Sequence, residues 1–213
     1  MKPVQRTRES TTCVEFSGSR VFALDGSRAA WDNGDTVFPQ PFLVQAALLH
    51  HLKVFGRCQV EFRFSKPWLS VTDGDTTVIF RMADSVPYHL ESAIPQKYLE
   101  EFSVSPREFL EELNYLKDVL PTTRKPYVYL RGNELLMQVH DRKYSTAIQI
   151  SRTGDTTVGF HLRHLYDALS QFKSEKRVIV KISGIHTPVV IEAEGRSDCA
   201  MVLPLRETLD AAA

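Results

Sequence analysis

Cysteine is scarce in this sequence: the 213 residues include only three, Cys13, Cys58 and Cys199, which lie far apart. They form no Cys-x-x-Cys pair, which argues against a structural zinc site and against a disulfide framework. We therefore expect reduced thiols, as in a cytoplasmic protein. Long apolar runs are also missing, and the first residues, MKPVQRTREST, contain no hydrophobic signal segment. These absences predict a soluble, cytoplasmic protein that has no membrane partner.

An excess of charge of either sign is missing too. Lys and Arg together number 26, and Asp and Glu together number 26, so the formal net charge is zero. A protein that coats nucleic acid by bulk charge is therefore not expected, although one face could still contact DNA loosely. Hydrophobic residues make up 43% of the chain, which is enough for the core of one large domain or of two domains of ordinary size.

Catalytic signatures are absent as well. The sequence contains no G-x-S-x-G, Walker A or G-x-G-x-x-G motif, and no pair of nucleophile and base stands out. His161 and His164 lie one helical turn apart and His50 and His51 are adjacent, but no carboxylate or cysteine ligands stand at matching positions. We predict surface or half-buried histidines, no metal, no cofactor and no enzymatic activity.

Three stretches of the chain share one order of elements. They run from Phe38 to Met82, from Phe102 to Ile150 and from Phe160 to Leu205. Each begins with Phe, continues as a helical pattern and ends in strands separated by polar turns. A repeat of this length indicates one structural unit that is used three times.

The helical patterns of the second and third repeats are the clearest. Apolar residues at helical spacing form one stripe in each helix. These residues are Leu110, Leu113, Leu116 and Leu120 in the second repeat, and Leu162, Leu165, Leu169 and Phe172 in the third. Ser105 ahead of Pro106 is expected to cap the second helix. The first helix, expected near Phe42–Phe55, is apolar over more of its surface, which predicts deeper burial.

Alternation of apolar and polar residues predicts strands after each helix. In CQVEFRF, for example, Val60, Phe62 and Phe64 fall on one face. Strands with one polar face are typical of antiparallel sheets that are covered on one side. Turns are expected at residues 73–75, 131–134 and 193–198. The sequence therefore predicts an α+β fold of repeated helix-plus-antiparallel-sheet units.

The repeats also predict the domain organisation. Ahead of them stands a partial copy, TTCVEFSGSRVFALDGSRAAW, which has strand patterns but no helix before them. Two units side by side would form one domain, which gives an incomplete domain at residues 1–98 and a complete one at residues 99–213. The stretch from Asp84 to Lys97, which contains two prolines, is expected to link them.

The corner RVFALDGSRAAW leaves two interpretations open. Asp25-Gly26 suits the tight turn of a hairpin, because this pair tolerates positive φ angles. Arg28, however, lies among small apolar residues. Either Arg28 pairs with a nearby acid in an ordinary hairpin, or the corner is the wall of a binding site in which small side chains leave room for a ligand.

Four stretches together resemble one family. FALDGSRAAW, VPYHLESAIP, VGFHLRHLYDAL, and GIHTPVVIEAEG followed by CAMVLPLR occur in the order and spacing of the bacterial DNA polymerase III beta subunit, the sliding clamp. The resemblance covers nearly the whole sequence and implies the DNA clamp fold. It implies a shortened clamp that lacks the first domain and the first helix of the middle domain. The last residues, ETLDAAA, extend beyond the Pro-x-Arg ending of that family.

Sliding clamps bind short peptides of polymerases and repair proteins in a pocket between the middle and last domains. The resemblance places three parts of this chain at that pocket. They are the corner with Leu24, Gly26, Ser27, Arg28 and Ala29; the linker with Pro87, Ser92 and Ala93; and the last domain with His186, Pro188, Met201, Leu203, Pro204, Leu205 and Arg206. Apolar anchors of the peptide would enter the trough, and arginine at its rim would bind the peptide backbone or a carboxylate.

The resemblance further implies contact with double-stranded DNA, because clamps surround the duplex with helices and meet its phosphates without reading bases. The DNA-facing candidates are Lys53, Arg57, Arg163, His164, Lys173, Lys176 and Arg177. Glu108, Glu111 and Glu112 on the second helix would repel DNA. For all these residues a solvated helix face is an equally good interpretation.

The expected function is therefore that of a DNA polymerase processivity factor, which docks partner peptides in an interdomain pocket and tethers them to DNA. Two domains per chain would reach the six of a clamp ring only as a trimer, a homo-oligomer that the resemblance leaves open. The alternative is a module that binds peptides or another clamp without encircling DNA, or a fragment of a longer clamp.

Overall fold

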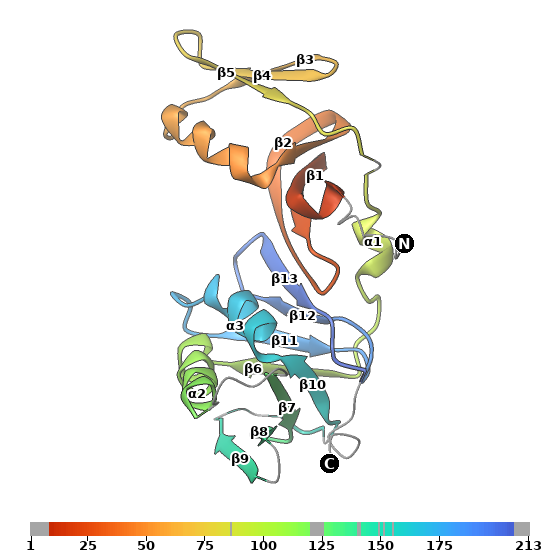
Figure 1. The fold of residues 1–213 in the computed structure, drawn as a ribbon, viewed down its shortest axis with the longest axis vertical. Helices are drawn as coiled ribbons and strands as arrows, with labels where there is room; N and C mark the ends of the chain where they lie inside the picture. The colour runs from red at the N-terminus through yellow and green to blue at the C-terminus, as the bar shows by residue number, and fades with distance from the viewer. Residues whose placement is uncertain are drawn as a thin grey trace, which may run out of the picture. The chain divides into compact units, whose positions relative to one another are not determined.

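The computed structural model describes residues 9–85, 87–119, 126–139, 142–148, 150, 152–154 and 156–206. The chain divides into two compact units (Figure 1). Unit 1 comprises Met1–Gly26 and Trp31–His89, and unit 2 comprises Ser27–Ala30 and Leu90–Ala213. Each unit has its own cluster of buried apolar side chains.

Unit 1 is built from a long hairpin, a helix and a three-stranded sheet. After the short helix η1 (Glu9–Thr12), the strands β1 (Cys13–Leu24) and β2 (Arg28–Gln45) pair around a turn at Gly26, whose φ of 87° suits glycine. The first residues of β2 are counted with unit 2. Helix η2 (Ala46–Phe55) leads into the antiparallel sheet of β3 (Glu61–Ser65), β4 (Trp68–Thr72) and β5 (Thr77–Arg81), in the order β3-β4-β5. The predicted Asp-Gly hairpin is confirmed.

Aromatic residues fill the core of unit 1. The rings of Phe16 and Phe42 stack with their centroids 4.7 Å apart, and Phe38 meets both rings edge-on. Strand β3 contributes Phe62 and Phe64 from one face, and their rings lie edge-on to Phe38 and Phe42, at 5.3 and 5.2 Å respectively. The predicted alternation of CQVEFRF, with its apolar residues on one face, is confirmed.

The expected buried helix at Phe42–Phe55 is wrong in two respects. Phe42 and its neighbours up to Gln45 continue strand β2, and the helix that follows, η2, is a ten-residue 3₁₀ helix. Phe55 is the buried residue of η2, whereas Val54 is 61% exposed. The physical reason is that the described residues of unit 1 provide no second long helix to cover the apolar side chains of η2.

Unit 2 contains two copies of a strand, a helix and three strands, preceded by the one-turn helix α1 (Leu90–Ala93). The first copy consists of β6 (Glu100–Val104), α2 (Pro106–Asp118), β7 (Tyr127–Arg131), β8 (Glu134–Val139) and β9 (Arg142–Ala147). The second copy consists of β10 (Val158–His161), α3 (Leu162–Ser170), β11 (Val178–Ile182), β12 (Val189–Glu192) and β13 (Asp198–Val202).

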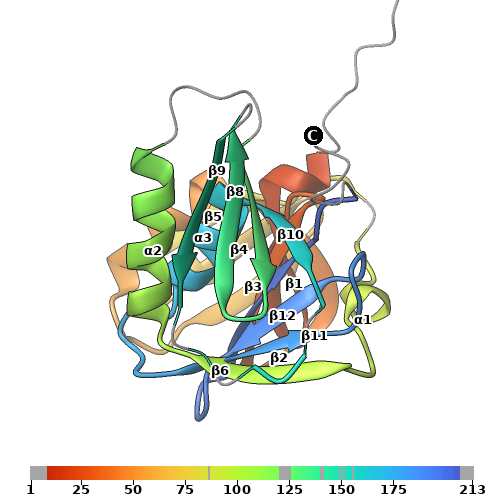
Figure 2. The ribbon, with the colours of Figure 1, turned by 90° about the horizontal axis from the view of Figure 1, so that it is seen from below.

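The first strand of each copy pairs with the sheet of the other copy. Strand β10 pairs with β7, and β6 pairs with β11, so that unit 2 holds the sheets β10-β7-β8-β9 and β13-β12-β11-β6. Both sheets are antiparallel throughout. Figure 2 shows α2 alongside the strands of the first sheet, where it contacts β9. Helices and antiparallel sheets in this arrangement confirm the predicted α+β fold.

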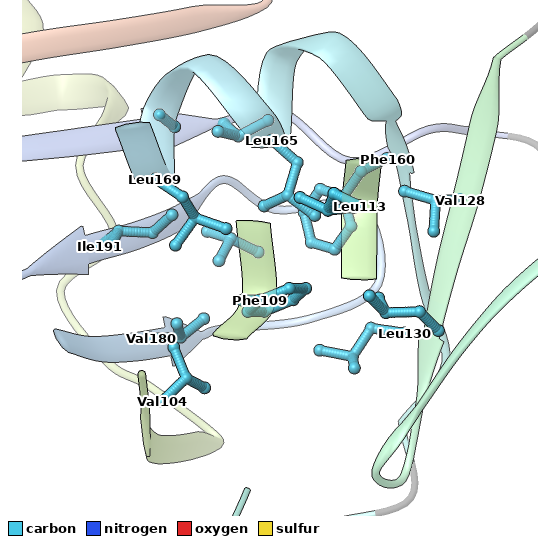
Figure 3. Packing of buried hydrophobic residues seen from close by; sticks show 14 of the residues in the cluster. Val104, Phe109, Leu113, Val128, Leu130, Phe160, Leu165, Leu169, Val180 and Ile191 are labelled. Carbon is cyan, nitrogen blue, oxygen red and sulfur yellow. The ribbon is translucent and has the colours of Figure 1, made fainter. Parts of the chain in front are cut away.

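The helices and sheets of unit 2 enclose its core (Figure 3). Phe109 and Leu113 of α2 lie beside Leu165 and Leu169 of α3, and all four side chains are buried. The predicted apolar stripes of the two helices are confirmed by these contacts. Leu120, which the pattern also included, lies outside the described residues, as does the tail ETLDAAA.

Local signals of the sequence are also confirmed. Ser105 caps α2, because its Oγ accepts a hydrogen bond from the backbone N–H of Glu108 at 3.4 Å, and Pro106 is the first residue of the helix. The turns expected at residues 73–75, 131–134 and 193–198 join β4 to β5, β7 to β8 and β12 to β13. No helix in the described residues has the length and apolar character needed to cross a lipid bilayer.

Candidate functional site

The residues expected at a binding site divide between the two units. Leu24, Gly26 and Pro87 belong to unit 1, where Leu24 and Pro87 are half-buried. Unit 2 holds the others, which are Ser27, Arg28, Ala29, Ser92, Ala93, His186, Pro188, Met201, Leu203, Pro204, Leu205 and Arg206. Within unit 2 the structure brings several of these residues together.

Backbone hydrogen bonds fix the residues that follow β13. The amide of Leu203 donates to the carbonyl of Ser27 at 2.8 Å, and the amide of Leu205 donates to the carbonyl of Gly159 in β10 at 2.8 Å. The Nδ1 atom of His186 lies 3.4 Å from the carbonyl oxygen of Leu205. Ser27, His186 and residues 203–205 are therefore neighbours, although they are far apart in the sequence.

The side chains of this group differ in exposure. Met201 on β13 is only 5% exposed, so it serves as a core residue beneath the surface. Leu203 is 40% exposed, and Ile185, which directly precedes His186, is 44% exposed. We call the resulting surface the C-terminal patch; it consists of Ile185, His186, Leu203, Leu205 and Arg206. Sequence reasoning missed Ile185, although an apolar residue in a loop beside a candidate site residue was the available signal.

Arg28 forms an ion pair with Asp167 of α3, and this contact lies within unit 2. The Nε atom of Arg163 lies 3.7 Å from the same carboxylate of Asp167. The structure therefore shows the pairing with a nearby acid that the ordinary-hairpin interpretation requires. The ion pair does not exclude a hydrogen bond from Arg28 to a ligand, because a guanidinium has five N–H donors. A role of Arg28 in ligand binding stays a prediction.

Two histidines stack at the start of α3. The rings of His161 and His164 lie 4.4 Å apart, and Tyr127 meets His161 edge-on. Burial lowers the pKa of His161, and the neighbouring groups His164, Arg163 and Arg28 lower it further, while Asp167 opposes them. The lowered pKa favours the uncharged form of His161. Across the described residues, no three His, Cys, Asp or Glu side chains gather in a group that could hold a metal ion.

The residues predicted to face DNA lie in both units. Lys53 lies on η2 and Arg57 just after it, and both are exposed. Arg163 and His164 lie on α3, where Arg163 is exposed and His164 is half-buried against His161. On α2, Glu108 and Glu111 are exposed to solvent. Whether any of these residues meets DNA stays a prediction.

The expected position of Lys173, Lys176 and Arg177 on the third helix is wrong. Helix α3 ends at Ser170, and the three cations lie exposed in the turns that follow it. The physical reason is a change in the backbone hydrogen bonds. The amide of Phe172 donates to the carbonyl of Leu169, and the amide of Glu175 donates to the carbonyl of Phe172. Turns closed by hydrogen bonds between residues three positions apart therefore replace the helix.

We expect the substitution Gly159→Ala to lower the free energy of unfolding by about 1–3 kcal/mol. A Cβ atom added at Gly159 would lie 2.7 Å from Cε1 of the buried Tyr129 ring and 3.3 Å from Cδ1 of Leu205. Urea denaturation measures the loss. Gly184→Ala is the matched control, because the nearest atom there is the hydroxyl of exposed Thr187 at 3.2 Å. Equal losses in the two variants would contradict the expectation.

Comparison of the chain with known proteins gives a match in structure only. No family model matches the chain, and no curated protein matches it in sequence. Among solved structures, the DNA polymerase III beta subunit of Thermotoga maritima is 16% identical with a TM-score of 0.80, and the match covers 94% of this chain and 58% of that one. The beta chain of DNA polymerase III from Streptococcus pneumoniae is 14% identical with a TM-score of 0.83, covering 96% and 59%. A sliding clamp from Bartonella birtlesii bound to griselimycin is 16% identical with a TM-score of 0.83, covering 96% and 60%.

This protein has the DNA clamp fold. The predicted resemblance to DNA polymerase III beta subunits is therefore confirmed at the level of structure. The chain spans about three fifths of the length of the clamps that it matches, because each match covers 58–60% of the clamp chain. Identities of 14–16% establish the fold alone.

Proposed function

We propose that this clamp-fold protein is an accessory factor of DNA replication that docks partner peptides and tethers them to double-stranded DNA, without a catalytic step of its own. The observation that carries this proposal is the match of 94–96% of the chain to sliding clamps with TM-scores of 0.80–0.83. Function is not fixed by fold, so the proposal also needs a suitable surface.

The C-terminal patch offers such a surface for a short peptide. Leu203 and Ile185 expose apolar side chains that a peptide anchor could cover, and Arg206 supplies a charge for a backbone carbonyl or a carboxylate. The backbone bonds to Ser27 and Gly159 hold the segment in place, which reduces the ordering that binding would require. Griselimycin, which is bound to the clamp of Bartonella birtlesii, is a small molecule with which binding at this surface can be tested.

Contact with DNA would come from exposed cations. Lys53, Arg57, Lys173, Lys176 and Arg177 are exposed side chains that could each neutralise a phosphate. Such contacts carry no sequence information and weaken steeply as salt rises. Binding to DNA in this proposal is therefore loose, independent of base sequence and sensitive to ionic strength.

The second candidate function is a peptide-binding or clamp-binding module that does not encircle DNA. The acidic surface of α2, with Glu108 and Glu111 exposed, and the net charge of zero favour it. Encirclement requires a closed ring, and two clamp units per chain would make six only in a trimer. Oligomeric state therefore separates the two candidates.

The test combines solution mass with retention on DNA. Sedimentation across a concentration series measures the mass, and retention is compared on nicked circular DNA and on the same DNA made linear. A trimer that stays on circles and slides off linear ends supports tethering by encirclement. A monomer that is retained on neither DNA overturns it and leaves the peptide-binding module as the working function.

Leu203→Glu is expected to weaken griselimycin binding by about tenfold to hundredfold, because it places a charge where an apolar contact is proposed. Leu203 is 40% exposed, so the fold should tolerate the change, whereas a charge at Met201, which is 5% exposed, would damage the sheet. Calorimetric titration measures the affinity. Leu99→Glu is the matched control, because Leu99 is 73% exposed and lies in unit 2 outside the C-terminal patch. Unchanged affinity in folded Leu203→Glu would remove the patch from the proposal.

A further inference from the structure

The sheet β3-β4-β5 of unit 1 has one covered face and one open face. The residues of its covered face join the apolar cluster of the unit; they are Phe62, Phe64, Leu69, Val71, Val78 and Phe80. Strand β2 and helix η2 lie on this side of the sheet, and η2 contacts β5 (Figure 1). Because successive side chains of a strand alternate between its faces, the other residues of the three strands form the open face.

Cross-strand pairing arranges the open face in three rows. In the first row, Trp68 of β4 lies between Ser65 of β3 and Arg81 of β5. The second row consists of Arg63, Ser70 and Ile79, and the third of Glu61, Thr72 and Thr77. We give the name Trp68 face to the first two rows together with the residue that follows β3 in the turn, Lys66.

The apolar side chains of the Trp68 face are open to solvent. Trp68 is 50% exposed and Ile79 is 62% exposed. Two of the residues next to Trp68 on this face are Ser65 and Ser70, whose short side chains leave the indole accessible. Trp31, the other tryptophan, is only 7% exposed. Trp68 is therefore an accessible aromatic surface on which another flat ring can stack.

Cations gather at the end of the sheet where Trp68 lies. Lys66 and Arg81 are exposed, and within the described part of the chain neither forms an ion pair. The acidic residues of the sheet lie toward its other end, in the β4–β5 turn and at Glu61. The carboxylate of Glu61 already accepts two hydrogen bonds from Arg63, at 2.9 and 2.8 Å. Charge therefore favours an anion beside Trp68.

We propose that the Trp68 face binds single-stranded nucleic acid. A base would stack on the indole of Trp68, and the flanking phosphates would contact Lys66 and Arg81. Such stacking selects a single strand, because the bases of a duplex are stacked on one another and their faces are covered. The proposal goes beyond the replication function proposed above and does not depend on it, since that function assigns duplex DNA to other cations.

A single strand satisfies both properties of the face at once. It carries flat rings for Trp68 and a negative charge on each phosphate for Lys66 and Arg81. An apolar protein segment would cover Trp68 and Ile79 but would leave the two neighbouring cations without a counter-charge. An acidic segment without aromatic residues would meet the cations but would offer no ring to the indole.

The probe is an oligothymidylate of about ten nucleotides, a length within the range that a single protein surface of this kind covers. Tryptophan fluorescence of the full chain is recorded during titration at low ionic strength, where phosphate contacts are strongest. We expect saturable quenching, because Trp68 is within reach of a ligand and Trp31 is buried. Anisotropy of the same oligonucleotide, labelled with a dye, gives the affinity without relying on tryptophan.

Trp68→Ala is expected to weaken binding about tenfold to hundredfold, because it removes the stacking surface. Trp68→Phe keeps an aromatic ring at the same position and should retain most of the affinity. Arg81→Gln should lower the slope of log affinity against log salt by about 0.7, the contribution of one phosphate contact on a single strand. The matched control is Tyr115→Ala, which removes a 52% exposed aromatic side chain from α2 in unit 2 and should leave binding unchanged.

Four results would each overturn the proposal. Absence of quenching, or equal affinity of the unaltered chain and Trp68→Ala, would remove Trp68 from any such site. Equally strong binding of a duplex of the same length would reduce the contact to phosphates. Equal affinity for thymidine monophosphate would make a mononucleotide the ligand. A blue shift of the emission that rises with protein concentration alone, and is lost in Trp68→Phe, would make a second copy of the protein the occupant of the face.

Discussion

Replacing Arg152 by Met is expected to lower the free energy of unfolding by about 3–5 kcal/mol. The Arg152 side chain is 1% exposed and that of Glu100 is 10% exposed. Their two hydrogen bonds, Nε to Oε2 at 2.7 Å and Nη2 to Oε1 at 3.0 Å, form a bidentate pair. Arg152 also donates to the carbonyl of Thr156. Removal of Arg152 leaves the carboxylate of Glu100 buried without this partner. The free-energy cost of such an unpaired buried charge exceeds the stabilisation that the intact pair provides.

Urea denaturation of three variants tests this account. The double variant Glu100→Gln/Arg152→Met should recover part of the loss, because it no longer buries an unpaired charge. Arg107→Met should change the free energy of unfolding by less than about 0.5 kcal/mol, because Arg107 and Glu111 form an exposed pair on α2, with side chains 82% and 63% exposed. A loss as small in Arg152→Met as in Arg107→Met would contradict the expectation.

The same pair predicts a dependence of stability on pH. The hydrogen bond from Arg152 lowers the pKa of Glu100 from its ordinary value of 4.5, against the opposing effect of burial. A lowered pKa in the folded state means that the contribution of Glu100 to stability is fully present above about pH 4.5 and is lost as the pH falls through the folded pKa. The slope of unfolding free energy against pH in this acid range should be smaller in Arg152→Met than in the unaltered protein.

The elements of unit 2 could be predicted because their signals are local and agree with one another. The stripes of α2 and α3, the cap at Ser105 and the polar turns each depend on residues a few positions apart, and the packing of the unit preserves them. At η2 the composition predicts a buried helix, but burial requires a neighbouring element. The described residues of unit 1 supply no second long helix to cover η2, so the sequence of η2 alone could not reveal its exposure.

The contacts among the residues of the candidate site could not be predicted from the sequence. Residue type indicated Arg28, but its partner Asp167 is 139 positions away, and no local pattern links them. The neighbourhood of Ser27, Leu203 and Gly159 depends on backbone hydrogen bonds, which any residue type can make. For the same reason the position of Lys173 outside α3 follows from backbone turns and not from its charge.

Phe109→Ala is expected to cost about 3–5 kcal/mol of the free energy of unfolding of unit 2. Phe109 of α2 is 2% exposed and packs in the core between the helices and the sheets (Figure 3). Truncation removes a whole ring from a position where strands and both helices meet, so the surroundings can close the cavity only in part. Far-ultraviolet circular dichroism under denaturant follows the loss, because the α-helices of more than one turn in the described residues, α2 and α3, both belong to unit 2.

Tryptophan fluorescence separates the effect on unit 2 from an effect on the whole chain. Both tryptophans, Trp31 and Trp68, belong to unit 1, and the core clusters of the two units share no residue. The fluorescence midpoint should therefore move less than the dichroism midpoint in Phe109→Ala. Tyr115→Ala is the control on the same helix, since Tyr115 is 52% exposed, and it should change stability by less than about 0.5 kcal/mol. Equal shifts of both midpoints in Phe109→Ala would show that the two units unfold together. A loss of stability in Tyr115→Ala as large as that in Phe109→Ala would show that the buried face of α2 does not hold the helix in place.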